Sequence, residues 1–259
     1  MGLVIWRYMS IPAFVSLLQT GELIFTRVDQ FSDQHEGVIS RPTLERVIAQ
    51  SHEAAQEHFK DSLEKKRLTH EKLWRFVLDM HKDSMEHSRK RAFVNCWHAN
   101  ESESVAMWDL YSKNGVAIRS SAVDLIMGSL PTRTLFCQVK YVDHLSEEVN
   151  DLWPFLFKRR EYAHESEYRA FLEMPREILL DAVGNEVHHI PVKYDLCRLI
   201  HEVRVAPGIP SWTFKAVQTL LTTYGLSEVP CNRAQADQLP DFLAEIEHRM
   251  LNPATVVGE

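Results

Sequence analysis

The segment HESEYRAFLEM, residues 164–174, carries the alternation from which the fold can be worked out. Its apolar positions lie two apart and would share one face of an extended chain: Tyr168, Ala170 and Leu172. Side chains of a strand repeat every two residues, so Glu165, Glu167 and Arg169 would share the other face. The segment therefore predicts a strand that packs one face in the core and carries a charged face.

Segments of similar character occur on both sides of this one. Residues rich in β-branched and aromatic side chains predict further strands at 3–9, 23–31, 91–99, 115–121, 134–143 and two within 187–207. Helical spacing predicts helices at 10–23, 100–115, 121–131, 211–225 and 239–251, and the ambiguous segment 153–165 favours a helix. Ser10, Pro12 and Gly21 suit the two ends of the first helix, and Ser211 suits the start of a later one.

The order of these elements predicts the fold class. Strands and helices mix without a strict strand–helix–strand alternation, which favours an α+β fold with a mixed or antiparallel central sheet flanked by helices. We expect residues 1–259 to form a single domain. Residues 43–91 contain no proline or glycine and predict a helical insert of two helices, with a short third one, folded against the body of the domain.

Composition excludes several classes of function. The 259 residues carry a net charge of −7, so bulk binding to nucleic acid is not expected. The four cysteines form no C-x-x-C pair and no zinc spacing, so we predict free thiols, a cytoplasmic location and no bound metal. No apolar run is long enough to cross a membrane, and no membrane partner is expected. Glycine-rich phosphate loops and a G-x-S-x-G turn are absent from the sequence, which disfavours Rossmann, P-loop and α/β-hydrolase enzymes.

Four stretches in a fixed order carry a family resemblance. They are WRYMS (6–10), QFSDQHEG (30–37), MWDLYSKNGVAI (107–118) and KRREYAHESEYR (158–169). In this order they resemble a widespread bacterial and phage-associated family described as a domain of unknown function, over about residues 5–233. The chain departs from the family pattern at Ser32, Gln34 and Tyr162. Trp97 and His98 stand where the family often has Phe-Ser.

The order of the motifs is also similar, more remotely, to that of ADP-ribosyltransferases. That similarity implies a split mixed sheet that holds NAD as the substrate, with Glu167 stabilising the charge on the ribose and Glu165 orienting an acceptor or taking its proton. It implies that Arg7 contacts phosphate, that Arg169 either holds Glu167 ionised or contacts phosphate, and that Trp108 and Tyr111 stack on the nicotinamide or adenine. The implied acceptor is a protein or a nucleic acid, and the implied role is that of a toxin or phage-defence effector.

Structural interpretations of the same residues remain open at this stage. Glu165 and Glu167 fit a solvated strand face paired with Arg169 or Lys158, and Trp108 and Tyr111 fit core packing. Arg7 equally fits an ion pair with Asp33 or Glu36. At the level of function, the alternative is a binding or regulatory module whose insert docks a partner. A third reading is a nuclease that holds a metal with Asp33, Glu36, Glu165 and Glu167.

Overall fold

A strand, a helix and a second strand begin the chain, as predicted: β1 (Val4–Ser10), α1 (Ile11–Thr20) and β2 (Glu22–Arg27). The Ser10 hydroxyl accepts a hydrogen bond from the Ala13 amide and caps the helix. Gly21 ends it in the left-handed conformation, with φ of 63°. The computed structural model describes residues 2–65, 67–128, 134–175, 179–180, 184–235, 246–247 and 250–251.

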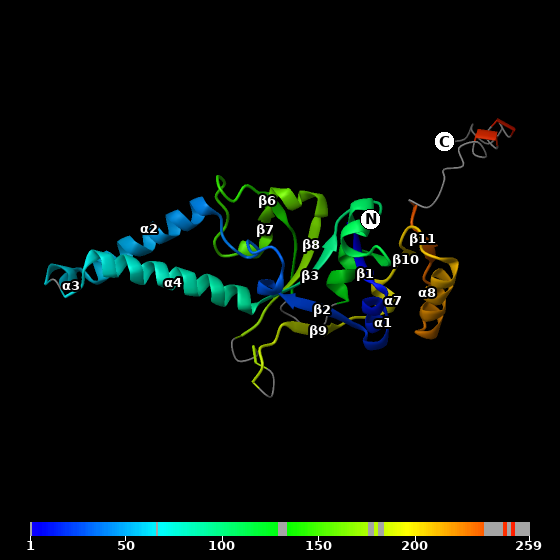
Figure 1. The fold of residues 1–259 in the computed structure, drawn as a ribbon, viewed down its shortest axis with the longest axis horizontal. Helices are drawn as coiled ribbons and strands as arrows, with labels where there is room; N and C mark the ends of the chain where they lie inside the picture. Colours follow the sequence, from blue (N-terminus) through cyan, green and yellow to red (C-terminus); the bar gives the residue numbers. More distant parts are fainter. Residues whose placement is uncertain are drawn as a thin grey trace.

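The described residues form a nine-stranded, mostly antiparallel sheet (Figure 1). Its order is β11-β10-β4-β1-β3-β2-β9, with β8 paired to β3 and β5 paired to β8. The further strands are β3 (Ala92–His98), β4 (Gly115–Ser121), β5 (Leu135–Gln138), β8 (Glu167–Glu173), β9 (His189–Lys193), β10 (Glu202–Val205) and β11 (Cys231–Arg233). Only β10 and β11 run parallel among these pairs. The predicted α+β class with a mixed central sheet is confirmed.

Strands β1 and β2 pair with opposite ends of β3 and leave an opening between them. Strand β8 pairs with β3 over its whole length. The start of β3 also pairs with β2, whereas its last residue, His98, pairs with Trp6 of β1. Between these two contacts Arg7 Nη1 donates to the Cys96 carbonyl oxygen at 2.6 Å. The side chain of Arg7 thus supplies the hydrogen bond that a neighbouring strand would otherwise give to this carbonyl group. This opening between β1 and β2 positions the candidate site.

Helices cover the sheet and connect its strands. They are α5 (Val105–Tyr111), α6 (Ala122–Met127), α7 (Leu196–Leu199) and α8 (Ser211–Thr223), with 3-10 turns η1 (Val28–Gln30), η2 (Pro154–Leu156) and η3 (Arg160–Glu165). Two short parallel strands, β6 (Lys140–Val142) and β7 (Phe157–Arg159), form a separate sheet. The main core joins β1, β3 and β4 to α1 and α8, and a smaller cluster forms around Phe155 and Phe171. Within the described residues, no helix is long and apolar enough to cross a membrane.

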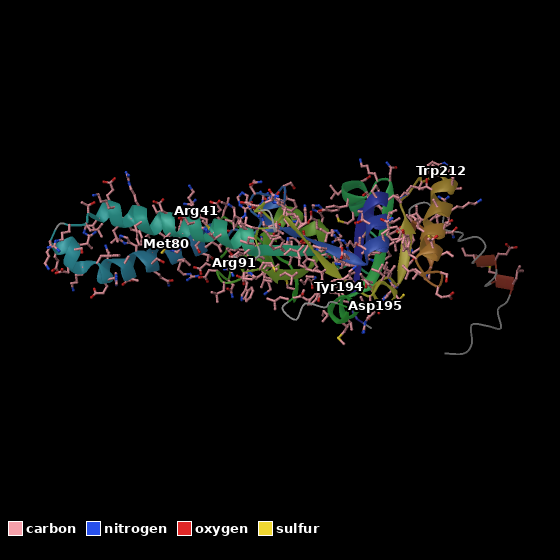
Figure 2. All side chains as sticks on the ribbon, turned by 90° about the horizontal axis from the view of Figure 1, so that it is seen from below. Arg41, Met80, Arg91, Tyr194, Asp195 and Trp212 are labelled. Atoms are coloured by element: carbon pink, nitrogen blue, oxygen red, sulfur yellow. The ribbon has the colours of Figure 1, made fainter. Side chains whose placement is uncertain are left out.

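The helical insert projects from the body, so the expectation that it folds against the body is wrong. It consists of α2 (Arg41–His58), α3 (Lys60–Glu64) and α4 (His70–Arg91), and Figures 1 and 2 show it extending away from the sheet. The reason is that each long helix has few buried positions: Thr43 and His52 on α2, Leu73 and Val77 on α4. The His52 ring stacks on the Trp74 ring with 3.5 Å between centroids. One narrow apolar stripe packs one helix on the other, and further apolar side chains of α4, such as Phe76 and Met80, stay exposed rather than packing on the body.

Several local predictions were wrong. Segment 153–165 is not one continuous helix, because strand β7 separates the 3-10 helices η2 and η3. The predicted strand 134–143 is divided into β5 and β6 by Val139. The predicted strand around residue 165 begins only at Glu167, because Ser166 adopts the left-handed conformation with φ of 45°. Pro210 rather than Ser211 stands at the cap position of α8. Most of the predicted helix 239–251 lies outside the described residues.

Candidate active site

A cavity of about 250 Å³ lies at the opening of the sheet. Strands β1, β3 and β8 supply Arg7, His98 and Glu167 to its wall, and α5 supplies Tyr111. Residues 31–33 and Glu36, which follow η1, form another part of the wall, and β7 and η3 add Lys158 and Glu165. Segments that lie far apart in the sequence therefore line the same cavity.

A buried lysine, Lys158, joins the two glutamates of the 164–174 segment. Lys158 Nζ lies 2.6 Å from Glu165 Oε2 and 2.5 Å from Glu167 Oε1. The left-handed turn at Ser166 produces this arrangement, since it brings both carboxylates to Lys158 although only Glu167 is on the strand. The Ser166 carbonyl accepts from the Ala99 amide at 2.7 Å, which holds the turn against the end of β3. Neither glutamate is solvated, because each is only 3 % exposed.

A second cation completes the network. Arg169 Nε lies 2.5 Å from Glu167 Oε2, and its Nη1 donates to Glu36 Oε1 at 2.7 Å. Glu36 Oε2 is 3.8 Å from Lys158 Nζ. Three buried carboxylates thus face two buried cations, so the ionised network would carry one net negative charge. Burial of unpaired charge is costly, so the network favours one protonated carboxyl group.

The two glutamates differ in their tendency to ionise. Burial raises the pKa of Glu165, and the neighbouring Glu167 raises it further against the opposing effect of Lys158. Burial also acts to raise the pKa of Glu167, but the charges of Arg169 and Lys158 outweigh it and hold this pKa well below its usual range. Glu167 is therefore ionised, and Glu165 is the group that holds a proton most readily. Pairs of carboxyl groups pushed apart in this way are typical of acid–base sites.

Arg7 lines the cavity without a carboxylate partner among the described residues. The sequence suggested an ion pair of Arg7 with Asp33 or with Glu36, and neither pair forms. Glu36 binds Arg169, and Asp33 Oδ1 lies 2.9 Å from Arg159 Nη2. Burial lowers the pKa of Arg7 from its usual value, although the guanidinium group remains charged at neutral pH. Among the described residues, the cavity thus has a cation that forms no ion pair with a carboxylate.

The two aromatic candidates are placed differently. The Tyr111 hydroxyl donates to Glu165 Oε1 at 2.8 Å and the residue lines the cavity. Trp108 is 2 % exposed, packs edge-on against Tyr8 with ring centroids 5.0 Å apart, and is not part of the cavity wall. Arg169 also lies behind the wall, where it holds the two acids Glu167 and Glu36. The structure therefore brings together Arg7, Tyr111, Glu165 and Glu167, and assigns Trp108 to the core.

Sequence reasoning named Lys158 only as an ion-pair partner of the glutamates, a pairing that is confirmed, and Glu36 only as a partner of Arg7 or a metal ligand. It did not name His98 as a site residue. Lys158 and Glu36 lie within the quoted motifs, so motif order could have suggested them as site residues. His98 had no such signal, since it stands at a departure from the family pattern. Its ring lies against Tyr8 and Tyr111, with centroid distances of 5.6 Å and 5.3 Å.

The comparisons with known proteins add no identification. No family model, curated protein or solved structure matches the chain. The family resemblance noted in the sequence therefore stays a prediction. In the part of the chain that the structure describes, no three His, Cys, Asp or Glu side chains form a group that could hold a metal ion.

The arrangement has a definite chemical capacity. An ionised carboxylate held by two cations can stabilise positive charge that develops on a substrate. A neighbouring carboxyl group of raised pKa can exchange a proton. A cation without a carboxylate partner can bind an anionic group. A substrate that suits all three has an anionic part next to a bond whose cleavage develops positive charge.

Proposed function

We propose that the cavity is the active site of an ADP-ribosyltransferase-like enzyme that cleaves the nicotinamide–ribose bond of NAD. The observation that carries the proposal is that Glu167, Glu165 and Arg7 meet in one cavity, with the pKa of Glu165 raised and that of Glu167 lowered. Departure of nicotinamide leaves an oxocarbenium-like ribose, and a fixed carboxylate lowers the free energy of that state.

Arg7 supports an anionic substrate, and the size of the cavity limits how much of that substrate it encloses. Arg7 would bind the pyrophosphate, since its guanidinium group has no carboxylate partner among the described side chains. Pockets for small ligands range from roughly 300 to 1,000 Å³, and this cavity has about 250 Å³. It would therefore hold the nicotinamide riboside end, with the adenosine end outside and Tyr111 against the nicotinamide.

Nicotinamide release from NAD by the purified full-length protein tests this proposal. We expect slow release by the wild type and a decrease of about 10²-fold or more in Glu167→Gln, since removal of one stabilising group commonly costs that much. Glu173→Gln is the matched control, because Glu173 ends the same strand, pairs with Arg91 and lies outside this cavity. Equal rates for Glu167→Gln and Glu173→Gln, with both proteins folded by circular dichroism, would contradict the proposal.

A second candidate function is docking of a protein partner on the insert. The projecting α4 exposes apolar side chains such as Phe76 and Met80 along a groove of about 640 Å³. Asp79 and Asp83 also line this groove, beside the ion pair of Arg91 with Glu173, and these two acids favour a partner that presents basic and apolar groups. Such a partner would be the acceptor of the ADP-ribose or a regulator.

Substitution of the groove tests this second function. The double variant Phe76→Asp/Met80→Asp should lose the partner that the tagged wild-type protein retains, while NAD cleavage is unchanged. Lys72→Asp is the control, because it adds an acidic side chain at an exposed position of α4 outside the groove. Retention of the partner by the double variant would exclude the groove as its docking site.

The cellular setting is part of the proposal. The four cysteines are free thiols, which is typical of the reducing cytoplasm. The role of a toxin or phage-defence effector follows only from the family resemblance and stays a prediction, as does the identity of a protein or nucleic-acid acceptor.

A further inference from the structure

His98 occupies the point where the two halves of the sheet meet. As the last residue of β3 it pairs with Trp6 of β1 on one side and with Glu167 of β8 on the other. Its side chain is 6 % exposed and forms part of the cavity wall. A histidine is therefore fixed beside the carboxylate that the proposed reaction needs.

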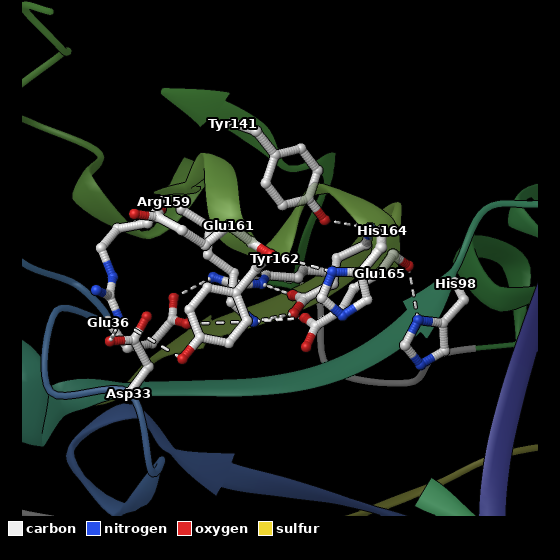
Figure 3. A network of polar contacts seen from close by, with 12 residues as sticks. Asp33, Glu36, His98, Tyr141, Arg159, Glu161, Tyr162, His164 and Glu165 are labelled. Carbon is white, nitrogen blue, oxygen red and sulfur yellow. Dashed lines mark hydrogen bonds and ion pairs between the residues drawn. The ribbon is translucent and has the colours of Figure 1, made fainter. Parts of the chain in front are cut away.

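One hydrogen bond determines which ring nitrogen of His98 carries the proton. Nδ1 lies 2.7 Å from the Glu165 carbonyl oxygen, and Figure 3 shows this contact. A carbonyl oxygen can only accept, so Nδ1 must donate. In the neutral ring Nε2 then has a lone pair, and none of the described residues forms a hydrogen bond with it. The arrangement leaves Nε2 free to accept a proton.

The surroundings keep the ring neutral. Burial lowers the pKa of His98, and the cations Arg7 of β1 and Lys158 of β7 lower it further. The hydrogen bond to the Glu165 carbonyl and the charge of Glu167 act in the opposite direction, without reversing the shift. Tyr8 and Tyr111 supply the flanking rings, and their pKa values are raised mainly by burial, so both hydroxyls are neutral.

The two glutamates of the 164–174 segment are already engaged. Glu165 accepts from Tyr111 at one oxygen and from Lys158 at the other, and both oxygens of Glu167 contact cations. A proton acceptor that remains free is needed wherever a hydroxyl group or water attacks the ribose. Sequence reasoning gave this role to Glu165, and the contacts of Glu165 favour a different residue.

We infer that His98 is the general base of the reaction, an inference that rests on the proposed function. His98 Nε2 takes the proton of water, or of an acceptor hydroxyl, as its oxygen forms a bond to C1′ of the ribose. The C1′–nitrogen bond breaks and its electron pair leaves with nicotinamide, which is neutral. The proton then passes from His98 to solvent, so NAD and water give ADP-ribose, nicotinamide and one proton.

The test is the pH dependence of kcat/KM for NAD in the full-length wild type and in His98→Asn. The asparagine amide can replace Nδ1–H as the donor to the Glu165 carbonyl, so positioning is kept and the base is lost. We expect wild-type kcat/KM to fall as pH drops and His98 takes up a proton. In His98→Asn this acid limb should disappear and the rate at pH 7.5 should fall by about 10²-fold or more.

Controls separate the failure of this inference from failure of the proposed function. His189→Asn changes an exposed histidine of β9 and should match the wild type. An unchanged acid limb and rate in His98→Asn, with its thermal unfolding intact, would overturn the role of His98 alone. Absence of nicotinamide release by the wild type would overturn the proposed function and this inference with it.

Discussion

Replacement of Lys158 by methionine perturbs the candidate site at its centre. Lys158 is 8 % exposed and its ammonium group contacts Glu165 and Glu167, with Glu36 at 3.8 Å. Methionine keeps much of the side-chain length and removes the charge. The network then has three carboxylates and one cation, so its net charge changes from −1 to −2 if every carboxylate stays ionised.

The expected loss of stability follows from the burial of these groups. Removal of one partner from a buried ion pair costs about 3–5 kcal/mol, because the other charge is left without compensation. Glu165 can reduce this cost by holding its proton to a higher pH than in the wild type, since burial already raises its pKa. A raised pKa in the folded state means that stability is lost as pH rises through it. The deficit of Lys158→Met should therefore be larger at pH 8.5 than at pH 5.5.

Urea unfolding measures this deficit from the midpoint and the slope at each pH. The double variant Lys158→Met/Glu165→Gln returns the net charge to −1 and should be more stable than Lys158→Met alone. Lys65→Met is the control, because Lys65 forms an exposed pair with Asp61 that is worth only about 0.3–0.5 kcal/mol. A deficit for Lys158→Met below about 1 kcal/mol, equal at both pH values, would refute the account of the network.

Four further substitutions test three separate parts of the structure. Arg7→Met should raise KM for NAD tenfold or more with kcat within about threefold, and steady-state kinetics that show only a decrease in kcat would contradict phosphate binding by Arg7. Gly37→Ala should cost about 2–4 kcal/mol in thermal or urea unfolding, because Gly37 has φ of 70° and a Cβ would lie 2.6 Å from the Phe155 ring. Gly225→Ala, at φ of 76° with open space around it, should cost clearly less, and equal costs would exclude the clash as the cause. Tyr111→Phe should cost about 1 kcal/mol by loss of the hydrogen bond to Glu165, whereas an unchanged urea midpoint would show that this bond adds no stability.

Local signals in the sequence predicted the parts of the fold that depend on neighbouring residues. Ser10 and Gly21 placed α1 correctly, since a cap and a left-handed end act within one turn of the helix. The alternation after residue 166 predicted β8, because one face of that strand packs in the core. These features need no knowledge of what lies across the sheet.

The parts that sequence analysis missed depend on contacts between distant segments. The turn at Ser166 is held by Ala99, and nothing around residue 166 indicates a left-handed serine. The pairing of Arg169 with Glu36 spans 133 positions, so the role of Glu36 was hidden. Trp108 and Tyr111 share helical spacing, but one enters the core and the other reaches Glu165, which only the packing of α5 determines.

Binding of intact NAD to the Glu167→Gln variant tests the central claim most directly. This variant should bind NAD without consuming it, so isothermal titration calorimetry can measure a dissociation constant. We predict binding below millimolar concentration for Glu167→Gln and a tenfold or greater weakening when Arg7→Met is added. No heat of binding at millimolar NAD, with the variant folded, would contradict the claim that this cavity is an NAD site.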